Sequence, residues 1–205
     1  MPVLFRAGSR YGLFLSLLSL MALVACSPAL DWREVRPPNA DGLRAQFPCK
    51  PEHASRTVTL PSVAQPMIMH VWSCQTGEVT WALSQVQVHE VTEVGPTLEA
   101  WPRVMQDNLR AASQMAGSQT PVQTTPLGPV QVRGMTPQAQ AQGWHFQARR
   151  VDGWGRPLDM GVTAWHFAHG LQIFQASVSR PVGTEPPGAA QDAELSFRDG
   201  LQFPG

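Results

Sequence analysis

Apolar and polar residues alternate along much of this chain, as they do in β-strands that bury one face. In residues 67–75, His70 and Trp72 share one face of such a strand and Met69 lies on the other. Gly77 follows this run and is typical of a hairpin turn, because glycine tolerates a positive φ. Similar runs predict strands over residues 43–47, 56–60, 67–75, 79–90, 130–135, 144–151, 158–167 and 171–180.

Helical spacing replaces alternation in two places. In residues 98–116, large apolar side chains recur every three or four positions, which predicts one long helix. Thr97 suits its N-cap and Gly117 its end. Pro102 would remove a backbone hydrogen bond from the helix interior, so we expect the helix to start late or to bend there. A short amphipathic helix is predicted over residues 189–199.

The order of these elements predicts an α+β fold, a mainly antiparallel sheet of about six to eight strands with the helices packed on one face. At 205 residues the chain can form one sizeable core, which we place in a single domain over residues 42–205. Residues 117–142, rich in Gln, Thr, Pro and Gly, predict a long surface excursion with one strand, at 130–135.

By element order, roughly residues 41–203 resemble the PsbP-like α/β/α sandwich found in several exported proteins. Members of that fold bind partner proteins or serve as accessory subunits, and they are not usually enzymes. The resemblance therefore implies a binding role.

Composition and charge exclude other classes of protein. With 43% apolar residues, 7 Trp, 8 Phe and 8 Met, the chain is too apolar to be disordered. Residues 26–205 hold 13 basic and 15 acidic side chains, a net charge of −2. Such a balance lacks the basic surface that nucleic acid requires, so we expect no nucleic-acid partner.

The first residues have the layout of a secretory signal, with a basic start and an uncharged apolar run over residues 11–25. That run of about fifteen residues is shorter than the roughly 20 that a spanning helix needs, which favours a cleaved signal over a permanent anchor. It ends in Leu23-Val24-Ala25-Cys26, which resembles the lipobox of bacterial lipoproteins. The alternative is a chance cysteine beside an ordinary cleavage site.

The lipoprotein resemblance implies that residues 1–25 are removed and that Cys26 carries a diacylglyceryl thioether. Two or more acyl chains anchor a protein stably to a membrane. Ser27, rather than Asp, implies sorting to the outer membrane, facing the periplasm, if the host has two membranes. Residues 26–41 then form a tether, in which Trp32 is a candidate for the first docked residue.

With Cys26 lipidated, Cys49 and Cys74 remain as a pair in an oxidising compartment, and we expect a disulfide between them. The alternatives are two free thiols or a metal site. Two cysteines alone do not complete a tetrahedral metal site, and no CxxC or Cys-His spacing accompanies them.

No catalytic motif is found in the sequence. The GxSxG, SxxK, Walker and dinucleotide-binding patterns are missing, and the carboxylates are scattered. His166 and His169 are the only close histidine pair, but a step of three residues along a strand puts them on opposite faces. The alternative is that a turn at His169-Gly170 brings the two rings together. His145 precedes two arginines and is expected to be solvated. We therefore expect no catalytic residue, no metal site and no cofactor.

One cluster is typical of protein interfaces. Trp154 lies in a glycine-flanked turn near Arg149, Arg150 and Arg156, and Trp and Arg are enriched where proteins meet. The alternative is that Trp154 packs back onto the core and the arginines are solvated.

These observations predict a lipid-anchored, non-enzymatic envelope protein, an accessory or binding module with an envelope protein or the cell wall as its partner. Two alternatives stay open. The Met and Trp residues on strand and helix faces could line a groove between helix and sheet, as in a carrier or sensor of an apolar ligand. A hydrolase with a dispersed active site is the other, since triads are defined in space and not by sequence.

Overall fold

A computed structural model describes residues 30–61, 63–152, 154–183 and 189–204. The predicted signal peptide and the predicted lipidation site Cys26, with Ser27 beside it, lie outside these described residues.

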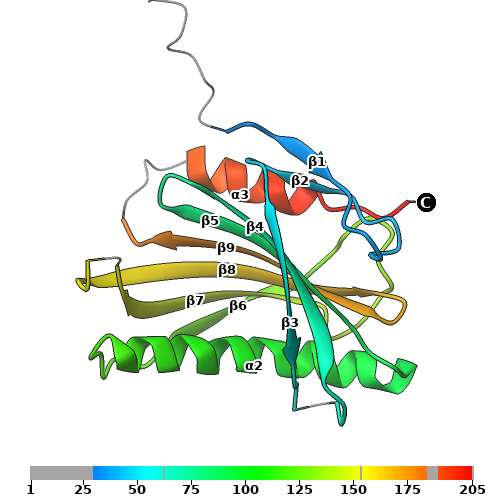
Figure 1. Ribbon diagram of the computed structural model, residues 1–205, viewed down its shortest axis with the longest axis horizontal. Helices are drawn as coiled ribbons and strands as arrows, with labels where there is room; N and C mark the ends of the chain where they lie inside the picture. The colour runs from blue at the N-terminus through cyan, green and yellow to red at the C-terminus, as the bar shows by residue number, and fades with distance from the viewer. Residues whose placement is uncertain (1–29, 62, 153, 184–188, 205) are drawn as a thin grey trace, which may run out of the picture.

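The fold is mixed α+β and is dominated by a seven-stranded antiparallel sheet (Figure 1). Its strands run in the order β3-β4-β5-β9-β8-β7-β6. They are β3 (Glu52–Val58), β4 (Met67–Thr76), β5 (Val79–Gln87), β6 (Gln123–Pro129), β7 (Gln142–Val151), β8 (Pro157–His169) and β9 (Gln172–Pro181). The sheet joins two meanders, β3–β5 and β6–β9, through the pairing of β5 with β9. The chain crosses between the meanders through helix α2 (Val91–Met115).

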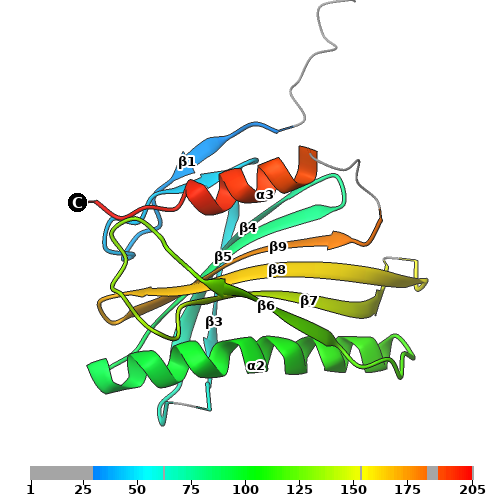
Figure 2. The same cartoon turned by 180° about the vertical axis from the view of Figure 1, so that it is seen from behind.

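The two helices cover opposite faces of the main sheet. Helix α2 lies on one face, and α3 (Ala189–Asp199) lies on the other beside a small sheet of β1 (Arg33–Val35) and β2 (Ala45–Phe47) (Figures 1 and 2). The expectation of both helices on one face is therefore wrong. The physical reason lies in β8, where every residue from Met160 to Ala168 is buried, so neither face of the sheet centre can be left to solvent.

Three clusters of buried side chains follow from this layering. One lies between the sheet and α3 and includes Trp81, Phe174 and Phe197. The other two lie beneath α2, one around Leu98 and one around Phe146. The core under α2 is thus divided in two.

Helix α2 begins earlier than its sequence pattern predicts. It starts at Val91 and contains Pro102 and a second proline. The side chain of Glu93 accepts hydrogen bonds from the backbone N–H groups of His89 and Glu90 at 2.9 and 3.1 Å, which caps this early start. Thr97 is therefore not the N-cap. Burial of Leu98 and its neighbours outweighs the cost of the prolines, because tertiary packing supplies most helix stability.

The strand predicted over residues 130–135 is also misplaced. The strand in this region is β6, seven residues earlier, which pairs with β7. Val130 and Val132 are buried in irregular chain that packs against the α3 side of the core. Their alternation reflects that burial, not strand pairing.

The segment expected to be a tether contains ordered structure. Strand β1 pairs with β2 in antiparallel register, Val35 opposite Ala45. Trp32 packs edge-on against Trp81, with ring centroids 6.4 Å apart. In the described part of the chain, no helix is long and apolar enough to cross a membrane.

The predicted disulfide is present. Cys49 and Cys74 are bonded, with their Cα atoms 5.9 Å apart. The bond links the chain that follows β2 to the end of β4, and so ties the small sheet to the main one.

Candidate functional sites

The predicted partner surface is centred on the turn between β7 and β8. Trp154 is 86% exposed there, which excludes the alternative in which it packs back onto the core. Asp152 shapes the turn, because its Oδ1 accepts the backbone N–H groups of Trp154 and Arg156 at 2.8 and 2.9 Å. These hydrogen bonds, that from Arg156 first, lower the pKa of the Asp152 carboxyl. Asp152 therefore holds the backbone at Trp154 and Arg156 in place.

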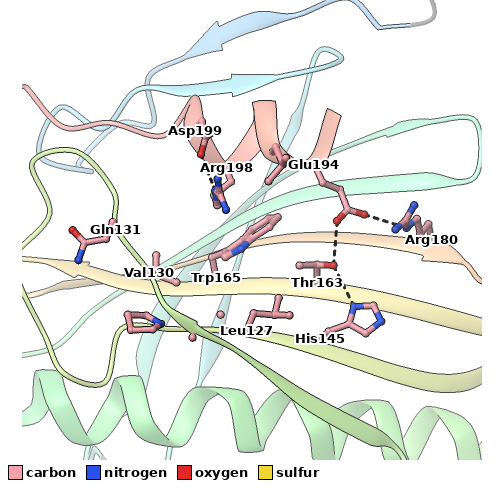
Figure 3. A pocket seen from close by; sticks show the side chains of 14 residues that line it. Leu127, Val130, Gln131, His145, Thr163, Trp165, Arg180, Glu194, Arg198 and Asp199 are labelled. Atoms are coloured by element: carbon pink, nitrogen blue, oxygen red, sulfur yellow. Dashed lines mark hydrogen bonds and ion pairs between the residues drawn. The ribbon is translucent and has the colours of Figure 1, made fainter. Parts of the chain in front are cut away.

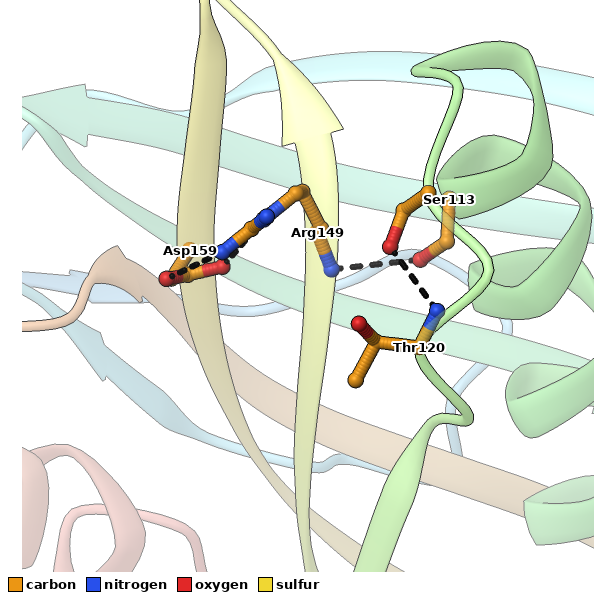
Figure 4. Close-up of polar contacts among 5 residues, drawn as sticks. Ser113, Thr120, Arg149 and Asp159 are labelled. Carbon is orange, nitrogen blue, oxygen red and sulfur yellow. Dashed lines mark hydrogen bonds and ion pairs between the residues drawn. The ribbon is translucent and has the colours of Figure 1, made fainter.

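The three arginines do not form one cationic cluster with Trp154. Arg149 makes a bidentate ion pair with Asp159, with N–O distances of 2.8 and 3.1 Å (Figure 4). The backbone N–H of Arg149 donates a hydrogen bond to the hydroxyl of Ser113 on α2. Arg156 pairs with Asp152 at 2.7 Å. Arg150 neighbours Arg149 on a strand and so points to the opposite face of the sheet. Carboxylates thus compensate two of the three charges.

A groove lies between α2 and the sheet, where the sequence placed a ligand site as an alternative. Its volume is about 890 Å³. The helix supplies one wall through Trp101, Val104 and Leu109, and β3 and β4 supply the other through Val58 and Met69. The groove opens between the two buried clusters beneath α2.

Small or polar side chains form the floor of this groove. Ala82 and Ser84 of β5 lie opposite Ser177 and Gln175 of β9, all on the face that α2 covers. Because these positions carry no large apolar group, α2 cannot fill the space above them. The sequence indicates this floor through serines and an alanine on one face of strands whose other face carries Trp, Leu and Val.

A second pocket lies on the opposite face, under α3, and has a volume of about 570 Å³ (Figure 3). His145, Thr163 and Arg180 point toward Glu194 of α3 there. The prediction that His145 is solvated is wrong. Its ring is half-buried, and burial, followed by the nearby Arg180 charge, lowers its pKa.

This polar pocket was not among the predictions from the sequence. Its signal is Gly143 and Gly161, two glycines inside strands, where glycine often marks a close approach of other groups. A Cβ on Gly161 would lie 3.3 Å from His145 Cε1, and one on Gly143 would lie 3.3 Å from Trp165 Cδ1. Both glycines therefore leave room for side chains that line the pocket.

The close histidine pair separates as its strand spacing predicts. His166 is buried on the α2 side near Trp101, and its Nε2 lies 3.0 Å from Oε1 of Gln175. His169 stacks on Phe203 on the other side, with ring centroids 4.2 Å apart. Across the described ranges, no three His, Cys, Asp or Glu side chains gather closely enough to hold a metal ion.

Compared with models of known protein families and with curated proteins, the chain matches none.

Proposed function

We propose that this chain is a lipid-anchored, non-enzymatic binding module of the cell envelope, and that it holds an amphipathic ligand in the groove between α2 and the sheet. The groove of about 890 Å³ carries the proposal. It lies within the roughly 300–1,000 Å³ range of small-molecule sites, so it is large enough for such a ligand.

The anchor rests on the sequence. The lipobox Leu23-Val24-Ala25-Cys26 supports attachment through Cys26, and Ser27 supports the periplasmic face of the outer membrane. A domain attached to a membrane lies close to lipids and other amphipathic molecules. The resemblance of the element order to the PsbP-like sandwich supports a binding role.

The lining of the groove suggests the chemistry of the ligand. Trp101, Val104, Leu109 and Met69 offer an apolar surface for an acyl chain. Arg56, at the exposed edge, is the one charged side chain among the residues that line the groove. A molecule with an apolar chain and an acidic head group matches both features, since a guanidinium pairs well with a carboxylate or phosphate.

Binding of dansylaminoundecanoic acid, a fluorescent fatty acid, to the full-length protein in detergent tests this proposal. Ala82→Phe places a large ring on the groove floor, and we expect it to weaken probe binding at least tenfold. Thr80→Phe is the matched control, because Thr80 lies on the same strand and face but outside the groove. Arg56→Gln should weaken the acid probe and leave its methyl ester unaffected. Equal binding by wild type and Ala82→Phe would contradict the proposal.

A protein partner at the β7–β8 turn is the second candidate, favoured by the 86% exposure of Trp154. Crosslinking and pull-down from native membranes would test it with Trp154→Ala and Arg150→Ala variants. We expect one abundant envelope protein that is captured by wild type and lost with Trp154→Ala. Capture indifferent to both changes would remove this surface from consideration.

A further inference from the structure

The pocket under α3 is separate from the groove, because the two lie on opposite faces of the main sheet (Figures 1 and 3). Its ceiling is formed by α3 and its floor by β7 and β8. The chain from Leu127 to Gln131 closes one side. Neither the anchor nor the groove explains it.

A chain of polar contacts crosses one end of this pocket. Nε of Arg180 lies 3.1 Å from Oε1 of Glu194, and the hydroxyl of Thr163 donates to Oε2 of the same carboxylate at 3.3 Å. Nδ1 of His145 lies 3.3 Å from that hydroxyl. Thr163 has one proton, which it gives to Glu194, so Nδ1 of His145 must be the donor in the last contact. The four groups come from three strands and α3, and each one orients the next.

Burying these charged groups under α3 costs free energy. The side chains of Glu194 and Arg180 are only 12% and 29% exposed, and taking an ion pair out of water often costs more than its attraction returns. Apolar residues of similar size would hold α3 on the sheet at least as well. A polar network kept in a pocket under such conditions indicates a ligand-binding role.

Charge balance restricts the class of ligand. Four charged side chains line the pocket, and they form two ion pairs, Arg180 with Glu194 and Arg198 with Asp199. A charged ligand would have to open one of these pairs. Hydroxyl groups both donate and accept hydrogen bonds, so they can bridge a guanidinium and a carboxylate while the pairs stay closed.

The pocket also has an apolar side. Trp165 lies on its floor beneath Arg198 and Glu194, with Leu127 and Val130 beside it (Figure 3). A ring with apolar C–H faces and hydroxyls at its rim meets both surfaces. We propose that this pocket binds a neutral, polyhydroxylated ring compound, of the kind presented by a short glycan.

Saturation-transfer NMR and calorimetry on the full-length protein, in a detergent without a sugar head group, test this proposal. The probes are a β-1,4-linked N-acetylglucosamine tetrasaccharide and maltotetraose, with glycine betaine as a zwitterion and acetate as an anion. We expect at least one oligosaccharide to bind and the two charged probes not to bind. Arg198→Ala and Glu194→Gln should each weaken that binding about tenfold, the scale of one hydrogen bond to a charged group.

Glu99→Gln is the matched control, because Glu99 forms an exposed ion pair with Arg103 on the far side of the molecule. It should bind the oligosaccharide like wild type. Far-UV circular dichroism reports whether each variant is folded, and Arg198→Ala changes a partly exposed side chain that the core does not need. Binding of neither oligosaccharide by wild type, preference for betaine or acetate, or equal binding by wild type and Arg198→Ala would each overturn the proposal.

Discussion

At the scale of single residues, His166 is a titratable group whose pKa lies far below its ordinary value. It is fully buried between β8 and α2, and burial lowers its pKa to about 4, against smaller opposing effects of hydrogen bonds to Gln175 and to the backbone of Gln142. The ring is therefore neutral in the folded protein at pH 7, whereas in the unfolded chain it titrates near its usual value of 6.5.

This difference predicts how stability depends on pH. Between pH 6.5 and 4 the unfolded chain binds a proton that the folded protein does not, so the free energy of unfolding decreases as the pH decreases. At about 1.4 kcal/mol per pKa unit, the full loss from His166 is about 3 kcal/mol. Urea denaturation at pH 7 and pH 4 should show it.

The variant His166→Gln should reduce this pH dependence. Part of it should remain, because the pKa of His145 is lowered as well. The carboxyls of Asp152 and Asp159 act below this window, since hydrogen bonds and ion pairs hold their pKa values under the usual 3.8. His89→Gln, at an exposed histidine, is the control and should behave like wild type. If His166→Gln left the dependence of the free energy of unfolding on pH unchanged, His166 would not be its source.

At the scale of elements, the sheet is held together by its hairpins and by one long-range pairing. β5 and β9 are far apart in the chain, yet they run together from Gln87 opposite Gln172 to Thr80 opposite Ser179. This pairing sets the four-residue floor of the groove. The disulfide then closes a loop of 25 residues between Cys49 and strand β4 of the same sheet.

Removing that disulfide should lower stability. The chain-entropy estimate for a loop of this size is roughly 3 kcal/mol, mostly from a less restricted unfolded chain. The double variant Cys49→Ser/Cys74→Ser should therefore unfold at a lower urea concentration than wild type. Adding reductant should lower the urea midpoint of wild type to that of the variant and leave the variant's own midpoint unchanged. Identical midpoints for oxidised and reduced wild type would contradict the expectation.

At the scale of the whole molecule, the two candidate ligand sites lie on opposite faces of one sheet, and the described chain begins at Leu30 on the α3 side. Cys26 precedes the first described residue, Leu30, by four positions. A fully extended chain spans at most about 3.6 Å per residue, so a lipid on Cys26 would sit within about 14 Å of Leu30. The folded domain would then stay at the membrane surface, where the groove could take up an amphipathic ligand.

The anchor itself can be tested on the full-length chain. Cys26→Ala should abolish labelling by radioactive palmitate and release the protein from membranes, because the acyl chains would be lost. Ser27→Asp should keep the label, and by the sorting pattern of lipoproteins it should move the protein to the inner membrane of a two-membrane host. Persistent labelling of Cys26→Ala would show that the lipobox interpretation is wrong.

Much of the fold follows from local pattern. Alternation placed β4, β5, β7, β8 and β9 to within a few residues, and the single remaining cysteine pair specified the disulfide. The start of α2 was missed because Glu93 caps a turn that the prolines after it seemed to forbid. The strand at residues 130–135 was wrong because Val130 and Val132 alternate for burial in irregular chain.

Which side chains share a face of a strand follows from the amino-acid sequence alone, because it depends only on the two-residue repeat of a strand. Which helix covers which face of the sheet depends on the three-dimensional packing, because a buried strand such as β8 is apolar on both sides. The polar pocket likewise depends on which face of the sheet α3 covers. His145, Thr163, Arg180 and Glu194 lie on four different elements, and no local spacing relates residues that meet only when α3 docks on the sheet.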